Sequence, residues 1–117
     1  HLRYNQITAE GGGAQALAEA LKINRTVRTI NLEKNRFGDA GAKVLGEALK
    51  VNQTVTKIDI EKNEIGDAGA KALAEALDKN QTVTKIDLLD NPIGDKGFEA
   101  IQNMKKEKKR NGFLLDI

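Results

Sequence analysis

The sequence has 117 residues, of which 39% are hydrophobic and 31% are charged, with 19 Lys and Arg against 17 Asp and Glu. This near balance gives no long-range attraction to nucleic acid or membrane, and no apolar run is long enough to span a bilayer. The absence of cysteine excludes disulfides and thiolate chemistry, and a single histidine, at position 1, argues against a histidine-based metal site. With three Phe, one Tyr and no Trp, the core must be built from aliphatic side chains.

The first predicted element is a helix within the first 23 residues. Ala14, Leu17 and Leu21 recur there at helical spacing and fall on one face. The stretch Glu10-Gly-Gly-Gly13 before it could suggest a phosphate-binding turn. It lacks the Lys-Ser/Thr of a P-loop and the glycine spacing of a dinucleotide fold, so no cofactor is predicted.

After this helix the sequence repeats itself. Residues 24–51 and 52–79 are identical at 17 of 28 aligned positions, and the eight residues NQTVTKID stand at both 52–59 and 80–87. A period of this length indicates a solenoid of stacked units. The whole chain is predicted to form one domain, with units over 1–23, 24–51, 52–79 and 80–117.

Each unit is predicted to hold a short strand and a helix. Ile30 and Leu32 alternate at strand spacing. Ala42, Leu45 and Leu49 then share one helical face. The last unit departs from this pattern, because a lysine replaces the final leucine of its helix, and a polar last unit suits the end of a solenoid.

Four sets of equivalent residues are expected to form the turns. Three aspartates are predicted to cap the N-termini of their own helices: Asp39, Asp67 and Asp95. Three asparagines are expected to close the helices in a left-handed turn: Asn24, Asn52 and Asn80. Three more are expected to bond backbone groups of neighbouring turns with their amides: Asn35, Asn63 and Asn91. Three glycines are expected to let helix and strand approach closely: Gly41, Gly69 and Gly97.

Stacked units would align their strands in a parallel sheet, with Ile30, Ile58 and Ile86 in register. Because a helix is wider than the spacing between strands, the stack should curve with the sheet on its inner side. Leu115-Asp116-Ile117 aligns with Ile86-Asp87-Leu88 and predicts one more strand. The start of the chain is expected to lie inside a repeat, since Leu2 aligns with Leu32.

The pattern LxxLxLxxN followed by IGDxGAxxLAEAL resembles leucine-rich repeats. The 28-residue period and the GDxGAxxLAEAL helix are similar to the ribonuclease-inhibitor-like subclass, which includes the repeat domains of NOD-like receptors, Ran GTPase-activating protein and tropomodulin. The resemblance covers essentially the whole chain. It implies an α/β leucine-rich-repeat solenoid of about four 28-residue units, a horseshoe arc with parallel strands on the concave side and helices on the convex side.

For function, the resemblance implies protein–protein interaction or scaffolding through the concave sheet face, in the cytoplasm, without enzymatic activity, a small-molecule substrate or a membrane. Three alternatives stay open. GTPase activation like that of Ran GTPase-activating protein needs a residue that orients GTP-bound Ran, and none is identified. Actin-filament capping resembles tropomodulin through stretches such as EALKVNQTV and EKNEI. A consensus-like array with a purely structural role is the third.

The exposed strand positions are predicted to form columns of side chains that meet a protein partner. Aligned carboxylates about 5 Å apart could bind a cation or perform acid–base chemistry. Because lysines lie beside them and no nucleophile or histidine accompanies them, no catalytic or metal site is predicted. The expected partner contacts are Tyr4, Arg28, Asn31, Glu33, Lys57, Asp59, Glu61, Lys85, Asp87, Leu89 and Asp90.

The basic run KKEKKR at 105–110 could be a nuclear signal or a nucleic-acid patch. A solvated helix end is favoured, because cations suit the negative end of the helix dipole. Without interleaved aromatic residues, single-stranded nucleic acid is not an expected partner. Both ends of the stack, at Leu2 and at 115–117, should present open strand edges, so self-association through them is a further expectation.

Overall fold

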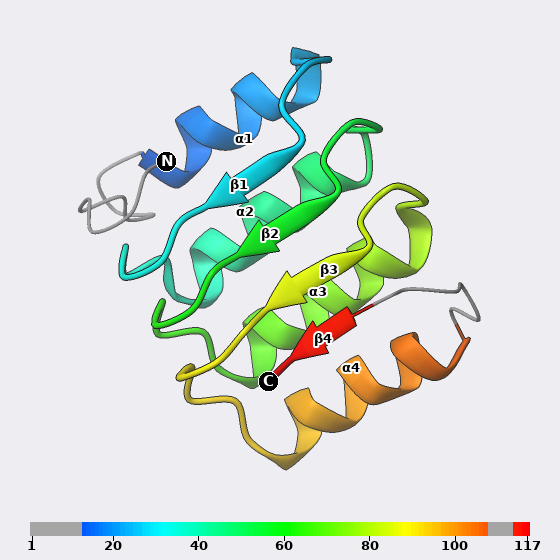
Figure 1. The fold of residues 1–117 in the computed structure, drawn as a ribbon. Helices are drawn as coiled ribbons and strands as arrows, with labels where there is room; N and C mark the ends of the chain where they lie inside the picture. The colour runs from blue at the N-terminus through cyan, green and yellow to red at the C-terminus, as the bar shows by residue number, and fades with distance from the viewer. Residues whose placement is uncertain (1–12, 108–113) are drawn as a thin grey trace.

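The computed structural model of the protein describes residues 13–107 and 114–117. Within these ranges helices and strands alternate along the chain (Figure 1). The helices are α1 (Gly13–Ile23), α2 (Gly38–Leu49), α3 (Asp67–Lys79) and α4 (Asp95–Glu107). The strands are β1 (Thr29–Asn31), β2 (Lys57–Asp59), β3 (Lys85–Asp87) and β4 (Leu114–Asp116).

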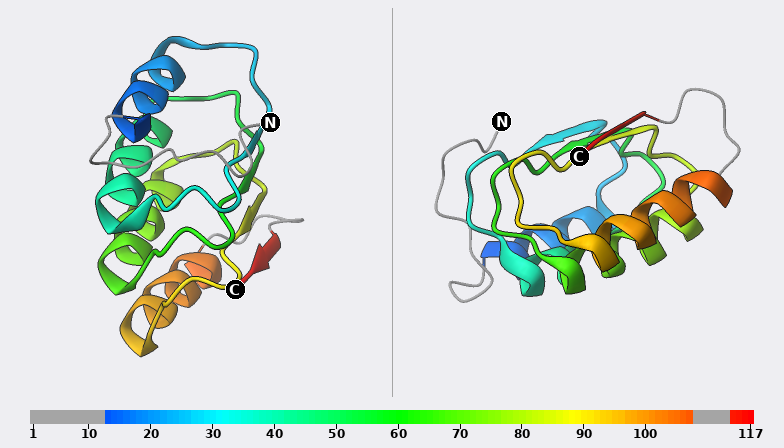
Figure 2. Two further views of the ribbon diagram at one scale, coloured as in Figure 1. Left: turned by 90° about the vertical axis from the view of Figure 1, so that its left-hand side faces the viewer. Right: turned by 90° about the horizontal axis from the view of Figure 1, so that it is seen from below.

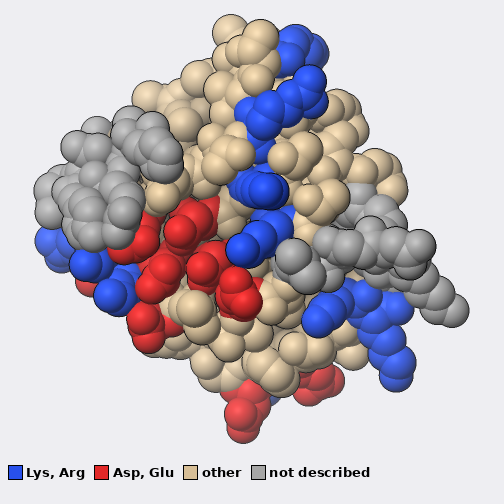
Figure 3. All heavy atoms as spheres, in the orientation of Figure 1, with Lys and Arg blue, Asp and Glu red and all other residues tan. Residues whose placement is uncertain are grey.

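The described strands form one parallel sheet in the order β1-β2-β3-β4. Ile30, Ile58, Ile86 and Leu115 lie opposite one another in register, which confirms both the predicted stacking and the predicted last strand. All the helices lie in a single layer on one side of the sheet (Figure 2). The other side of the sheet is the one that faces the viewer in Figure 3. The fold is therefore the predicted α/β solenoid, with the sheet on its inner side.

The space between sheet and helices is filled by aliphatic side chains. Ile58 and Ile86 from the strands and Leu45 and Leu73 from the helices are at most 2% exposed. The last helix differs from the others in one respect, because its Phe98 is 46% exposed. Its equivalents in α2 and α3 are alanines that the next unit buries, whereas the described chain has no helix beyond α4 to cover Phe98.

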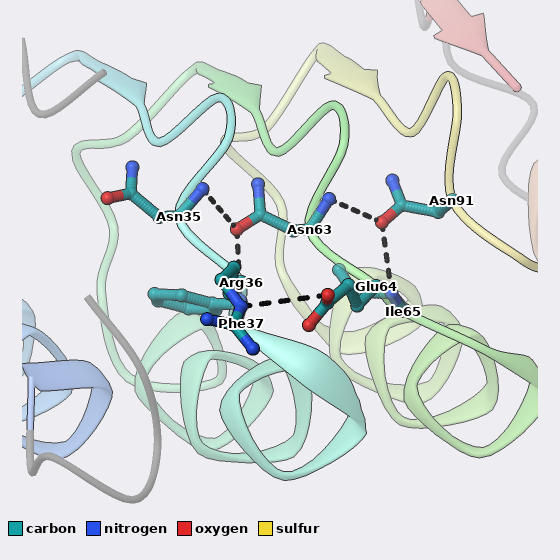
Figure 4. Close-up of polar contacts among 7 residues, drawn as sticks. All are labelled: Asn35, Arg36, Phe37, Asn63, Glu64, Ile65 and Asn91. Atoms are coloured by element: carbon teal, nitrogen blue, oxygen red, sulfur yellow. Dashed lines mark hydrogen bonds and ion pairs between the residues drawn. The ribbon is translucent and has the colours of Figure 1, made fainter. Parts of the chain in front are cut away.

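A ladder of asparagine side chains joins the turns that follow the strands (Figure 4). The Asn63 Oδ1 accepts hydrogen bonds from the backbone N–H groups of Asn35 and Phe37, both at 3.1 Å. Its Nδ2 donates to the carbonyl of Leu32 at 2.8 Å. Asn91 repeats these bonds one unit later. The predicted bonding of these amides to neighbouring turns is confirmed.

The aspartates at the helix starts join neighbouring units rather than capping their own helices. The Asp39 Oδ1 accepts from the N–H groups of Gly66 at 2.6 Å and Gly69 at 3.0 Å, at the start of α3. Asp67 makes the same two bonds to the start of α4, at 2.7 and 3.0 Å. The predicted self-capping is wrong because each aspartate already lies inside its helix and reaches the helix N-terminus of the next unit.

Replacing Asp67 by Ala is expected to lower the free energy of unfolding by about 1 kcal/mol, the usual cost of losing a helix cap. Asp95→Ala is the matched control, since Asp95 begins α4 as Asp67 begins α3 but no described helix follows for it to cap. Urea denaturation of both variants measures the difference. Equal losses in the two variants would show that the bonds to α4 contribute nothing.

The asparagines between helix and strand adopt a different geometry from the predicted left-handed turn. Asn80 has φ −75° and ψ 133°, which is extended. Its Oδ1 accepts from the N–H groups of Thr82 and Val83, both at 2.8 Å, and its Nδ2 donates to the carbonyl of Leu49 at 2.8 Å. The side chain therefore shapes its own turn and also provides a donor for a carbonyl at the end of α2, the helix one unit earlier.

Glycine in the first turn of α3 and of α4 permits close contact with the preceding unit. A Cβ placed on Gly69 would lie 2.6 Å from the Asp39 Oδ1 and 3.0 Å from the Cβ of Ala42. It would also lie 2.7 Å from the Cγ2 of Ile65 in its own unit. The predicted approach of helix to strand is therefore corrected to an approach of helix to helix.

Candidate functional site

The solvent-facing side of β1–β4, together with the turn after each strand, is called the sheet face here. Because the strands are in register, equivalent side chains form columns across it. Thr29, Lys57 and Lys85 are aligned in one column, which we call the basic column. The column two residues further along, which we call the acidic column, holds Asn31, Asp59, Asp87 and Asp116. Figure 3 shows a row of basic side chains beside a patch of acidic ones.

Most of the residues predicted from the sequence as partner contacts lie on or beside this face. Five of them are half-buried: Asn31, Asp59, Glu61, Lys85 and Asp87. Four are exposed: Arg28, Lys57, Leu89 and Asp90. Tyr4 lies outside the described residues. Asp116 extends the acidic column and was missed, although its alignment with Asp87 in the repeat was the signal that could have revealed it.

Glu33 differs from the expectation, because it is buried at 9% exposure. Other predicted contacts also lie in turns after the strands instead of in the strands: Glu33, Glu61, Leu89 and Asp90. Lys34, Lys62 and Asp90 have φ values of 61°, 57° and 59°, so the chain turns sharply at each of them. The three-residue strands end before these positions.

Carboxylates gather where β1 and β2 end. Oxygen atoms of Glu33, Asp59 and Glu61 all lie within 4.8 Å of one another. We call these three residues and Asp87 the acidic cluster. Oxygen donors of this kind are the ligands that Ca²⁺ and Mg²⁺ prefer. Exposed acidic groups often cluster without an ion, however, and we assign no metal to them.

The carboxylates of the acidic cluster repel one another. Burial, followed by the charges of Asp87, Glu33 and Asp59, raises the pKa of Glu61. Burial also raises the pKa of Asp87, with contributions from Asp59 and Asp116, while a backbone hydrogen bond and Lys85 act in the opposite direction. A cationic group placed against this cluster would relieve the repulsion.

Replacing Asp87 by Asn is expected to raise the free energy of unfolding at neutral pH by roughly 0.5 kcal/mol, because like charges opposite each other on partly exposed strands repel. The Asn Oδ1 can still accept the bond from the Leu89 N–H, 3.0 Å away. Folding raises the pKa of Asp87, so ionisation opposes folding above the folded pKa. The gain should therefore disappear well below 3.8, the ordinary value for aspartate. Urea denaturation across pH measures it, and a gain that persists in acid would rule out charge as the cause.

The sheet face is shallow. A depression of about 180 Å³ crosses the first three strands, lined by backbone and side chains that include Lys57, Asp59, Lys85 and Asp87. Pockets for drug-sized ligands are usually about 300–1,000 Å³. Two open grooves on the helix layer are larger, about 350 and 440 Å³, and lie between α3 and α4. The outer surface of the helices is therefore the alternative binding surface with which the sheet face must be compared.

Comparison with known proteins defines the class. The family model described as Leucine Rich repeat matches residues 1–18, 24–46, 51–74 and 79–101, more than half of the chain. The chain belongs to the leucine-rich-repeat family, which confirms the resemblance noted in the sequence. Comparison with curated protein sequences finds no match.

Two solved structures are similar to the chain. One is described as leiomodin-1 actin-binding site 2, with 28% sequence identity and a TM-score of 0.80, covering 97% of this chain and 67% of that one. The other is the C-terminal domain of tropomodulin from Caenorhabditis elegans, with 14% identity and a TM-score of 0.70, covering 80% of this chain and 57% of that one. At that identity the second shows the fold alone. The family and the first of these neighbours support a protein-binding module.

Within residues 13–107 and 114–117, no helix has the length and apolar character needed to cross a membrane.

Proposed function

We propose that the protein binds a protein partner through its sheet face and acts as an interaction or scaffolding module in the cytoplasm. The observation that carries this proposal is the alignment of the basic column beside the acidic column. A partner of complementary chemistry would place acidic groups against Lys57 and Lys85 and basic groups against the acidic cluster. Because charges across an interface set specificity and orientation, two adjacent rows of opposite sign fit one docking direction.

Two features favour recognition over catalysis. The face is shallower than a usual small-molecule pocket. The two aspartates in the middle of the acidic column also hold the chain itself, since the Asp59 Oδ1 accepts from the Glu61 N–H at 3.1 Å and the Asp87 Oδ1 from the Leu89 N–H at 3.0 Å. These bonds fix the carboxylates in place, which lowers the entropy lost when a partner binds.

A direct test uses two variants that each lose two lysines and two acids. The sheet-face variant carries Lys57→Gln, Lys85→Gln, Asp59→Asn and Asp87→Asn, and its amides keep the turn hydrogen bonds. The helix-face variant carries Lys43→Gln, Lys71→Gln, Glu47→Gln and Glu75→Gln, all at exposed positions. Both variants keep the net charge of the wild-type chain. A difference in their binding therefore cannot come from a change in overall charge. In affinity capture from a cell extract, we expect the helix-face variant to retain the wild-type partners and the sheet-face variant to lose them.

The second candidate is an actin-binding role, favoured by the similarity to leiomodin-1 actin-binding site 2 at 28% identity. The chain would then bind actin through the same face. Fluorescence anisotropy of labelled monomeric actin, titrated with the chain, tests this. Saturable binding that the sheet-face variant loses would support actin as the partner. Absence of binding would exclude actin as the partner. The capture experiment would still test whether the sheet face is the binding surface.

A further inference from the structure

A trough crosses the sheet face between the basic column and the acidic column. It is the shallow depression of about 180 Å³, with Lys57 and Lys85 on one side and Asp59 and Asp87 on the other. Ile58, between Lys57 and Asp59, is 2% exposed because its side chain enters the core, so the strand backbone forms the floor. A segment that fills this trough therefore runs across the strands and meets opposite charges on its two sides.

The two columns leave most of their charge available to a partner. Among the described residues, the one ion pair between the columns joins Lys85 to Asp116, at 3.9 Å, with side chains 42% and 49% exposed. Exposed pairs of this kind contribute little to stability. Figure 3 shows both kinds of charge at the surface on this side. The columns therefore do not neutralise each other.

The spacing of the columns selects the conformation of the segment that lies along them. Equivalent side chains on neighbouring strands are about 4.8 Å apart. One face of an α-helix recurs about every 5.4 Å, whereas one side of an extended chain recurs roughly every 6.7 Å. The acidic column runs from Asn31 on β1 to Asp116 on β4, which is three steps.

The difference accumulates over these three steps. A helix falls out of register with the column by about 2 Å, and an extended chain by about 6 Å, which is more than a whole strand spacing. Long charged side chains can absorb the first difference but not the second. The pitch of the columns therefore favours a helix over an extended peptide.

The distance between the two columns also suits a helix. The columns are two residues apart along each strand, which is roughly 6.7 Å. Consecutive residues of a helix lie about 100° apart around the axis, because 3.6 residues make one turn. Two stripes of side chains offset by one residue therefore lie side by side, on a cylinder about 10 Å across. A helix over the trough can present one stripe to each column.

Like charges on neighbouring strands make a segment with both signs more favourable than one with a single sign. Asp59 lies opposite Asp87, and Lys57 lies opposite Lys85. Both pairs repel. A helix with an acidic stripe and a basic stripe offsets both repulsions at once, whereas a uniformly charged helix would offset one and add to the other.

We propose that the partner segment is an α-helix that crosses the strands, with its acidic stripe over the basic column and its basic stripe over the acidic column. The matching pattern has Glu or Asp at i, i+4 and i+7, each followed directly by Arg or Lys. Arg suits the basic stripe best, because its planar fork binds two carboxylate oxygens at once. This assignment rests on the proposed function, since the sheet face must be the binding surface, and adds the conformation and charge pattern of the bound segment.

A synthetic helix tests the proposal. The striped peptide repeats Glu-Arg-Ala-Ala-Glu-Arg-Ala three times, which gives two charge stripes and a length at which isolated helices form. The peptide is titrated into the isotope-labelled full chain, and binding is followed by NMR through the backbone amide signals. We expect saturable shifts at the residues that line the trough and none at Lys43 or Lys71, which are exposed on the helices.

Two matched peptides separate the helical stripe pattern from charge alone. One contains the same residues in an order that scatters the charges around the helix. The other replaces the central Ala-Ala pair by Pro-Pro, so it keeps every charge but forms no continuous helix. Circular dichroism checks the helicity of all three. Each control should bind at least about ten-fold more weakly than the striped peptide. Equal binding by either control would overturn the proposal.

Paired changes on the two molecules test which stripe faces which column. Lys57→Gln with Lys85→Gln should weaken binding by about the same factor as replacing every Glu of the peptide by Gln. Because both changes remove the same contacts, the two together should weaken binding little more than either does alone. Losses that multiply would show that the acidic stripe does not lie over the basic column, contrary to the proposal.

Failure of this proposal is distinguishable from failure of the proposed function. If the striped peptide does not bind while captured partners still require the sheet face, the partner helix is overturned and the sheet face stands as the binding surface. If captured partners bind the sheet-face variant as well as the wild type, the surface itself is wrong.

Discussion

Replacing Asn63 by Ala is expected to lower the free energy of unfolding by roughly 3 kcal/mol, because it strips partners from several buried backbone groups. Its Oδ1 holds two N–H groups of the preceding turn, and its Nδ2 holds the carbonyls of Leu32 and Glu61 at 2.8 and 3.0 Å (Figure 4). Asn63 is 0% exposed, so water cannot replace the lost side chain without opening the turn. Urea denaturation gives the loss.

Asn91→Ala is the matched control for this prediction. Asn91 makes the equivalent bonds to the N–H groups of Asn63 and Ile65 and to the Ile60 carbonyl, at 2.9, 3.0 and 3.0 Å. It is only half-buried, so water can reach the groups that it leaves, and the loss should be clearly smaller. Equal losses at the two positions would show that burial does not set the cost of breaking the ladder.

Replacing Gly69 by Ala is expected to lower the free energy of unfolding by roughly 1–2 kcal/mol, although Ala is favoured over Gly in a helix by about 1 kcal/mol. The new Cβ would overlap the Asp39 Oδ1 at 2.6 Å and the Ile65 Cγ2 at 2.7 Å. Relief of that overlap would push α3 away from α2 and strain the bond between Asp39 and the Gly69 backbone. Thermal and urea denaturation measure the loss.

Gly46→Ala provides the comparison. A Cβ at Gly46 meets its nearest atom, the Ala72 carbonyl oxygen, at 3.2 Å, so the contact is tight but the overlap is smaller. The helical preference for Ala should then nearly offset it, and the stability should change little. A stabilised Gly69→Ala variant would contradict the close approach between neighbouring helices.

The repeat made the architecture predictable. Once two stretches of 28 residues align, Ile30 and Ile58 must occupy the same place in their units, and stacking then sets the register of the sheet. The asparagine ladder was predictable for a related reason. A polar side chain at a sharp turn beside buried backbone needs hydrogen-bond partners, and the next unit supplies them.

Contacts that cross from one unit to the next were harder to assign. Asp39 follows the local rule for helix capping, yet its carboxylate serves the helix that begins 28 residues later. No feature of one unit alone distinguishes these two outcomes. The burial of Glu33 was missed for a similar reason, since strand alternation assigns a side and the sharp turn at Lys34 then changes the surroundings.

The candidate face was predictable as a set of columns but not in its electrostatics. Alternation put Lys57 and Asp59 on one side of the strand, and the register confirmed their alignment with Lys85 and Asp87. The raised pKa of Glu61 depends on burial and on three carboxylates from neighbouring strands and turns, and their distances require the three-dimensional structure.

The most direct measurement is the ratio of dissociation constants of the two four-charge variants for a captured partner or for actin. If the sheet face is the binding surface, the sheet-face variant should bind at least about ten-fold more weakly than wild type, a loss of about 1.4 kcal/mol, while the helix-face variant binds as wild type does. A helix-face variant that loses affinity while the sheet-face variant keeps it would contradict the account and assign binding to the outer helices.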